Sequence, residues 1–162
     1  MAILNNRVGK VLAAAVAASV ALLVGLEGYP GKPYYDVAGI LTDCYGNTKN
    51  VSPNRIRSDL ECRELLEGEA LRIGEFVYAD VPAEHRIPKN TLAAVISWTY
   101  NVGDGAYRGS TLRQYLRRGD WAAACHQMSR WVYITEPRSG AKVVSKGLQN
   151  RRAHEVQVCL DF

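Results

Sequence analysis

Two carboxylates and a hydroxyl lie close together near the start of the chain, and together they could perform acid–base chemistry on a sugar. Glu27 is followed after eight residues by Asp36, and Asp36 is followed after five residues by Thr42. Hydrolysis of a glycosidic bond needs two carboxyl groups: one protonates the leaving oxygen, and the other activates water or stabilises positive charge at the sugar carbon. This spacing is common by chance, so taken alone each acid could equally be a surface charge.

The surroundings of the two acids differ, and the difference indicates separate roles. Glu27 follows a run of apolar residues, and partial shielding from water favours the protonated carboxyl that a general acid needs. Asp36 lies in a stretch rich in Tyr and Gly, where it should stay ionised, and Thr42 could share a water molecule with it. Direct attack by water requires carboxyls about 6.5–9.5 Å apart, whereas a nucleophilic Asp36 requires about 5–5.5 Å. Of these two we expect direct attack.

The elements that must position these residues are a small β hairpin and a set of helices. The stretch 28–48 is rich in Gly, Pro, Tyr and Asn, which predicts short strands joined by tight turns. Ser58 and Glu61 form a capping box, which predicts a helix from there to about residue 78. Later helices are expected over about 90–101, 110–117, 121–131 and 146–160, with a turn-rich stretch at 135–140.

These elements predict an α+β fold that is mostly α, with a small N-terminal β-hairpin lobe and a larger helical lobe. The 162 residues, 48% of them hydrophobic, are enough for one core. The formal net charge is +4, and acidic and basic residues alternate over most of the length. Nucleic-acid binding usually requires basic residues clustered on one face, so no nucleic-acid partner is expected.

Residues 1–26 form an apolar N-terminal segment that is marginal as a membrane anchor. Its sixteen uncharged residues, 11–26, lie between Lys10 and Glu27. As a helix they would span about 24 Å, which is shorter than a hydrocarbon core of about 30 Å. Four Leu and four Val favour insertion by about 0.3–0.6 kcal/mol each, and the other eight residues add little. Such a segment could enter a bilayer and also leave it.

Three interpretations of this segment compete. Ala15, Val16 and Ala17 resemble a cleavage site, which would make the segment a signal peptide, although with a very short apolar run. A permanent anchor is disfavoured by the weak hydrophobicity. A weak anchor that later releases fits best, because the segment runs directly into Glu27 and could complete the first helix of the domain. Basic residues without acids at the start predict a cytoplasmic N-terminus and an external domain.

Four cysteines indicate disulfides rather than a metal site. Cys44, Cys62, Cys125 and Cys159 form no close CxxC pair, and the three histidines are scattered, so no metal or cofactor is expected. An exported chain favours two disulfides over four buried thiols. Sequence alone does not choose among the three possible pairings. We expect a local crosslink in each half, Cys44 with Cys62 and Cys125 with Cys159.

An ordered series of motifs over about residues 25–160 resembles the phage-type lysozymes, endolysins that degrade the bacterial cell wall at the end of infection. The series begins with Glu27 in GLEG, a tyrosine-rich link to Asp36, and Thr42. It continues with YGNT at 45–48, WTYNVG at 98–103, STL at 110–112, GDW at 119–121 and RW at 130–131, and it ends with GL at 147–148, Arg151, Arg152 and Glu155.

This resemblance implies a lysozyme-like fold and hydrolysis of the β-1,4 bond between N-acetylmuramic acid and N-acetylglucosamine, without cofactor or metal. Glu27 would be the general acid, Asp36 with Thr42 would position or activate the water, and Asn101 would line the sugar cleft. Arg151 or Arg152 could steady the ionised form of Glu27, although both could be surface charges on the last helix.

The N-terminal segment is similar to that of endolysins with a signal-anchor-release sequence. The expected division is therefore an anchor at 1–26 and a catalytic domain at 27–162. The enzyme would first be inactive and held in the host inner membrane through residues 11–26, with its catalytic domain facing the periplasm. After release it would be a soluble, monomeric periplasmic enzyme acting on peptidoglycan.

Two departures from the family pattern matter. Asn47 stands where the family usually has His, which puts a bridging contact from that position to a neighbouring helix in doubt. No cysteine precedes Cys44, so an anchor cysteine cannot rearrange the disulfides on activation.

Two other functions remain as alternatives: a catalytically idle, membrane-tethered wall-binding protein, and a lytic transglycosylase, which would not need a water-positioning pair.

Overall fold

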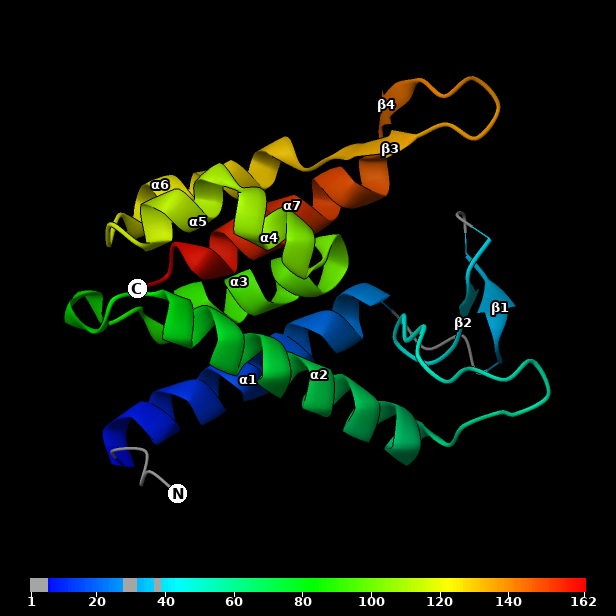
Figure 1. Cartoon of the computed structure of the whole chain (residues 1–162), viewed down its shortest axis with the longest axis horizontal. Helices are drawn as coiled ribbons and strands as arrows, with labels where there is room; N and C mark the ends of the chain where they lie inside the picture. Colours follow the sequence, from blue (N-terminus) through cyan, green and yellow to red (C-terminus); the bar gives the residue numbers. More distant parts are fainter. Residues whose placement is uncertain (1–5, 28–31, 37–38) are drawn as a thin grey trace.

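The structure, a computed structural model, describes residues 6–27, 32–36 and 39–162, and of residues 6–8 the backbone alone. It is mostly helical, with two small hairpins that lie toward the same end of the molecule as the C-terminal end of α1 (Figure 1). The elements in chain order are α1 (Asn6–Glu27), β1 (Tyr34–Tyr35), β2 (Leu41–Thr42), α2 (Asp59–Asp80), η1 (Ala83–His85), α3 (Lys89–Val102), α4 (Asp104–Gly109), α5 (Thr111–Leu116), α6 (Trp121–Gln127), η2 (Met128–Arg130), β3 (Tyr133–Thr135), β4 (Lys142–Val144) and α7 (Lys146–Cys159).

Helix α3 lies at the centre of the helical lobe. Every residue from Thr91 to Thr99 is buried, which is the pattern of a helix covered on all sides. Helices α1 and α2 pack on it from one side and α7 from the other, as Figure 1 shows. This core brings the C-terminal end of α3 close to the ends of α1 and α7, where the candidate site residues lie.

The apolar N-terminal segment is part of this core. Helix α1 runs without interruption to Glu27 and buries a stripe at helical spacing, made up of Leu12, Ala15, Ser19 and Leu23. Residues 9–27 also have a mean hydropathy of 2.1, so the helix is long and apolar enough to cross a membrane, although core helices of soluble proteins pass the same test. One segment therefore meets the requirements of both a core helix and a membrane span.

The small lobe follows α1, as expected from the turn-rich sequence. Strands β1 and β2 pair antiparallel, with Tyr34 opposite Thr42. A disulfide joins Cys44 to Cys62 of α2, and the hydroxyl of Tyr100 on α3 donates to the carbonyl of Tyr45 (2.7 Å). The expected β-hairpin lobe is thus confirmed for the described residues, while the expected turns at 28–31 and 37–38 lie outside them.

Several sequence predictions for the helices and disulfides are confirmed. The backbone N–H of Glu61 donates to the Ser58 hydroxyl (3.2 Å), and the Glu61 carboxylate accepts from the Ser58 N–H (2.8 Å), so the capping box that begins α2 is present. The second disulfide joins Cys125 to Cys159, which confirms the expected pairing of all four cysteines. The helices expected near residues 90, 110 and 146 become α3, α5 and α7.

Three features differ from the sequence prediction. Helix α4 forms within what was expected to be a break, because the chain resumes a helical course at once after Gly103, whose φ is +89°. The helix expected over 121–131 ends earlier, as α6, and continues as the tighter turn η2. The turn-rich stretch at 135–140 closes an unexpected antiparallel hairpin, β3–β4, in which the Glu136 N–H donates to the carbonyl of Ala141 (2.9 Å).

Candidate active site

Glu27 is the last residue of α1 and lines a cleft of about 1210 Å³. Its side chain is 22% exposed and forms an ion pair with Arg151 of α7. The C-terminal end of a helix disfavours a negative charge, and a guanidinium contact favours it. The two effects oppose each other at this carboxyl. The ion pair with Arg151 also holds the Glu27 side chain in place. Of the two arginines considered from the sequence, Arg151 makes this contact.

A second carboxylate, the buried Glu155 of α7, also binds Arg151. The Arg151 Nε donates to Glu155 (3.0 Å), and the Ser97 hydroxyl of α3 donates to the same oxygen (2.7 Å). Arg152 forms an ion pair with the other oxygen of Glu155. Glu155 is fully buried and the two arginines nearly so, so this network of two acids and two bases, with Glu27 as its fourth member, is neutral within the protein.

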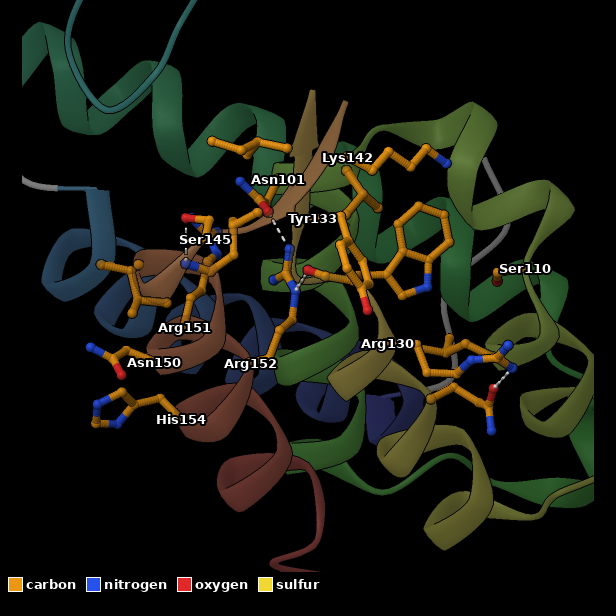
Figure 2. Close-up of a pocket in the computed structure, with 18 of the residues that line it drawn as sticks. Asn101, Ser110, Arg130, Tyr133, Lys142, Ser145, Asn150, Arg151, Arg152 and His154 are labelled. Atoms are coloured by element: carbon orange, nitrogen blue, oxygen red, sulfur yellow. Dashed lines mark hydrogen bonds between the residues drawn. The ribbon is translucent and has the colours of Figure 1, made fainter. Parts of the chain in front are cut away.

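Arg152 connects this network to the opposite wall of the cleft. Its guanidinium donates to the side-chain oxygen of Asn101, and its Nε donates to the carbonyl of Trp131 (3.0 Å), contacts that Figure 2 shows side by side. Burial lowers the pKa of Arg152, and the negative charge of Glu155 opposes that shift. Asn101 lines the same cleft as Glu27, and its side-chain oxygen is held by Arg152.

Asp36 and Thr42 are held together on the small lobe by one residue between them. The Ile40 N–H donates to the Asp36 carboxylate (2.9 Å), and the Thr42 hydroxyl donates to the Ile40 carbonyl (3.0 Å). Because its proton is engaged, the Thr42 oxygen is left to accept a hydrogen bond. Neither residue is among the described residues that line the cleft beside Glu27. The structure therefore groups Asp36 with Thr42, and Glu27 with Asn101.

Tyr34 on β1 links the two groups electrostatically. Burial raises the pKa of its hydroxyl, and the charges of Glu27 and Asp36 raise it further. Both carboxylates are thus near enough to act on the same tyrosine. Tyr100 of α3 responds in the same way, since burial and then Glu27 raise its pKa. Two tyrosines, one from each lobe, therefore lie within electrostatic reach of Glu27, whose ion-pair partner is Arg151.

The far wall of the cleft comes from elements that the sequence did not predict as functional. The β3–β4 hairpin contributes Tyr133 and Lys142, and Figure 2 shows both over the same cavity as Asn101. Trp131, which also lines the cleft, packs edge-on against the buried ring of Trp98 (5.2 Å between centroids). The available signal for this hairpin was a Pro-Arg-Ser-Gly turn with Tyr133-Ile134-Thr135 before it and Val143-Val144 after it, since all five are aromatic or β-branched residues.

Asn47 makes its contacts within the small lobe. Its amide donates to the Asp43 carboxylate (2.6 Å), and Asp43 in turn pairs with Arg57 (2.8 Å). Other residues of this loop contact α2: Lys49 pairs with Glu69 (3.2 Å), the Tyr45 hydroxyl donates to Asp59 (3.1 Å), and Cys44 forms the disulfide to Cys62. Asn47 thus closes its own loop, and its neighbours in that loop make the contacts to α2. Over the described ranges no three His, Cys, Asp or Glu side chains gather as metal ligands would.

Comparison with known proteins gives a consistent result. The sequence model of the family Phage lysozyme matches residues 24–155. A SAR-endolysin of Bacteriophage PS119 is 40% identical over 137 residues, which cover 84% of this chain and 77% of that protein. Among solved structures, the endolysin from Escherichia coli O157:H7 phage FAHEc1 has a TM-score of 0.78 at 27% identity, covering 89% of this chain and 91% of that one. The active form of P1 phage endolysin Lyz has a TM-score of 0.72 at 26% identity, covering 93% and 92%.

Proposed function

The chain belongs to the phage lysozyme family and is a muramidase endolysin of the signal-anchor-release subclass, and from this premise we propose how its residues divide the work. Its substrate is bacterial peptidoglycan, in which it hydrolyses the β-1,4 bond between N-acetylmuramic acid and N-acetylglucosamine. Glu27 is the general acid that protonates the glycosidic oxygen. Asp36 and Thr42 hold the attacking water, and Asn101 contacts the sugar.

The observation that carries this assignment is the position of Glu27. It is a carboxyl at the edge of a large cleft, held by one arginine that is itself fixed by a buried acid. A general acid must be held in one orientation at the mouth of the substrate site. The shared contacts of Asp36 and Thr42 with Ile40 support a joint role for them, because one backbone segment fixes both polar groups. With water as the nucleophile, the product would have inverted stereochemistry.

Replacing Glu27 by Gln tests the acid. Loss of a general acid lowers the rate by about 10²–10⁴-fold. Glu75→Gln on the exposed face of α2 makes the same chemical change away from the cleft, so it should leave the rate at its wild-type value. Turbidity loss of purified cell walls measures both, and circular dichroism shows whether each variant is folded. Wall lysis by Glu27→Gln at the wild-type rate would refute the assignment, and anhydro-sugar products would indicate a transglycosylase.

We also propose that residues 1–26 first tether the enzyme to the inner membrane and then leave it, so that the monomeric domain 27–162 works in the periplasm with α1 docked. The exposed side of docked α1 supports this, because it carries small alanines rather than large apolar side chains. The exposed alanines are Ala13, Ala14, Ala17 and Ala21. Leucines at these positions would strengthen membrane insertion with little effect on the folded core.

The triple variant Ala13→Leu, Ala17→Leu and Ala21→Leu tests release. It adds about 1–2 kcal/mol of insertion free energy, so more protein should stay in the membrane fraction and lysis should start later. The matched control puts leucine at Ala79, Ala122 and Ala153, which are exposed on other helices. Both purified proteins should lyse walls normally in solution. If the two triple variants partition and lyse alike, weak hydrophobicity of the segment does not control release.

A further inference from the structure

Glu155 is a fully buried carboxylate to which the mechanism above assigns no step. It accepts hydrogen bonds from Arg151, Ser97 and Arg152, so both of its oxygens are engaged. A buried acid with this many charged partners is fixed in one orientation. It is separated from the cleft by its own partners and touches none of the residues assigned to substrate. Any effect on catalysis must therefore pass through the two arginines.

Each arginine uses one edge on Glu155 and presents the other edge to a cleft residue. Arg151 reaches Glu27 at the end of α1, and Arg152 reaches Asn101 at the end of α3. A guanidinium is planar and its donors are rigidly placed, so fixing one edge fixes the other. The orientation of Glu155 on α7 is thus passed to two side chains that come from different helices and face the substrate.

Glu155 also sets the charge that Glu27 experiences. The groups facing Glu27 are Arg151 from α7, Tyr34 from β1 and Tyr100 from α3, and Arg152 and Glu155 stand behind Arg151. With Glu155 ionised, the two arginines are balanced by two carboxylates. Without its charge, two cations act on Glu27 alone and favour its ionised form. A general acid that ionises too readily has no proton to give at neutral pH.

We propose that Glu155 is a positioning residue that aligns Glu27 through Arg151 and Asn101 through Arg152, and whose negative charge offsets the two arginines beside Glu27. This inference rests on the proposed role of Glu27 as the acid. It predicts that the charge of Glu155, and not merely its bulk, controls the alkaline limb of the pH–activity profile.

The experiment compares pH–activity profiles of the full chain in its soluble form on purified cell walls. Glu155→Gln should move the alkaline limb down by about one pH unit and lower activity tenfold above it. Glu155→Asp keeps the charge, so its limb should stay in the wild-type position even if the rate falls. Asp80→Asn is the matched control, since Asp80 also binds two arginines but does not line the cleft. It should lower Tm without moving the limb.

Arg152→Gln provides an independent variant in case Glu155→Gln does not fold. It removes a cation from the same network, so the alkaline limb should move up, opposite to the first variant. Unmoved limbs in the folded variants would overturn the proposal and leave Glu155 a structural residue. Carboxyl-carbon NMR of Glu27 distinguishes failure of the Glu155 proposal from failure of the proposed acid. If the titration midpoint of Glu27 shifts in Glu155→Gln but the alkaline limb of activity does not, Glu155 acts on Glu27 and Glu27 is not the acid.

Discussion

The close approach of α1 to α2 at Gly74 can be tested by adding one methyl group. A Cβ built on Gly74 would lie 3.1 Å from the side-chain ends of Leu12 and Ile96 and 3.2 Å from that of Val16. Leu12 and Val16 belong to α1 and Ile96 to α3, so three helices meet at this glycine. On the same helix, Gly68 has nothing within 4 Å of the equivalent position, which makes it a matched control.

Both Gly→Ala changes should stabilise the helix by about 0.5–1 kcal/mol, because alanine loses less backbone conformational entropy on folding than glycine. Gly74→Ala must also displace three packed side chains, and overpacking of this kind costs about 1–3 kcal/mol. Gly68→Ala should therefore stabilise the protein, and Gly74→Ala should be less stable than it by about 1–3 kcal/mol. At about 2–4 °C per kcal/mol for a chain of this size, the two Tm values should differ by roughly 2–12 °C.

Urea unfolding of the two purified variants gives this difference directly. Measuring the difference between them cancels the backbone term, so the result reports on packing alone. Gly74→Ala should also delay release, because α1 docks less well against α2. Equal stabilisation by the two alanines would show that α1 does not pack against α2 at this point, and the placement of the N-terminal segment in the enzyme core would then be wrong.

Two further predictions concern stability. Arg113 holds the pKa of Asp80 below its usual range, so Asp80 stabilises the fold fully above about pH 4 and loses this contribution as pH falls through the lower folded-state pKa. In urea unfolding, the destabilisation by Asp80→Asn should be largest at neutral pH and vanish in strong acid, and a difference that does not depend on pH would refute the ion pair. The disulfides Cys44–Cys62 and Cys125–Cys159 close loops of 18 and 34 residues. Replacing both cysteines of a pair by Ser should therefore lower the free energy of unfolding by about 3 kcal/mol for the first and about 4 kcal/mol for the second. An unchanged free energy of unfolding in the same assay would refute the pairing.

Local patterns in the sequence predicted the parts of the fold that depend on neighbouring residues. The capping box of Ser58 and Glu61 marks the start of α2 because both hydrogen bonds are made within three residues. The Gly, Pro and Tyr content of the stretch after Glu27 indicated the small lobe for a similar reason. Helix α4 was missed because its six residues are too few to show a periodic apolar pattern.

The candidate site could be predicted only in part, because its contacts join residues far apart in the chain. Arg151 and Glu27 are separated by 124 positions, and Arg152 and Asn101 by 51. The motif around residues 151–155 drew attention to both arginines but could not show which one faces Glu27. Glu155 belonged to that motif, but its position suggested no role, since an acid four residues after Arg151 also fits an exposed helical ion pair. Burial against Ser97 distinguishes the two cases, and burial is a property of the tertiary fold.

The N-terminal segment shows how one sequence can meet the demands of two environments. Its buried polar residue, Ser19, donates its hydroxyl to the carbonyl of Val16 in the same helix (2.8 Å), so this hydrogen bond travels with α1 and needs no partner from the core. Leu12 and Leu23 are apolar and need none either. Glu27 is different, because its partner Arg151 lies on α7 and is gained only when α1 docks. In the proposed release, the ion pair of the proposed catalytic acid is therefore formed by the same event that completes the core.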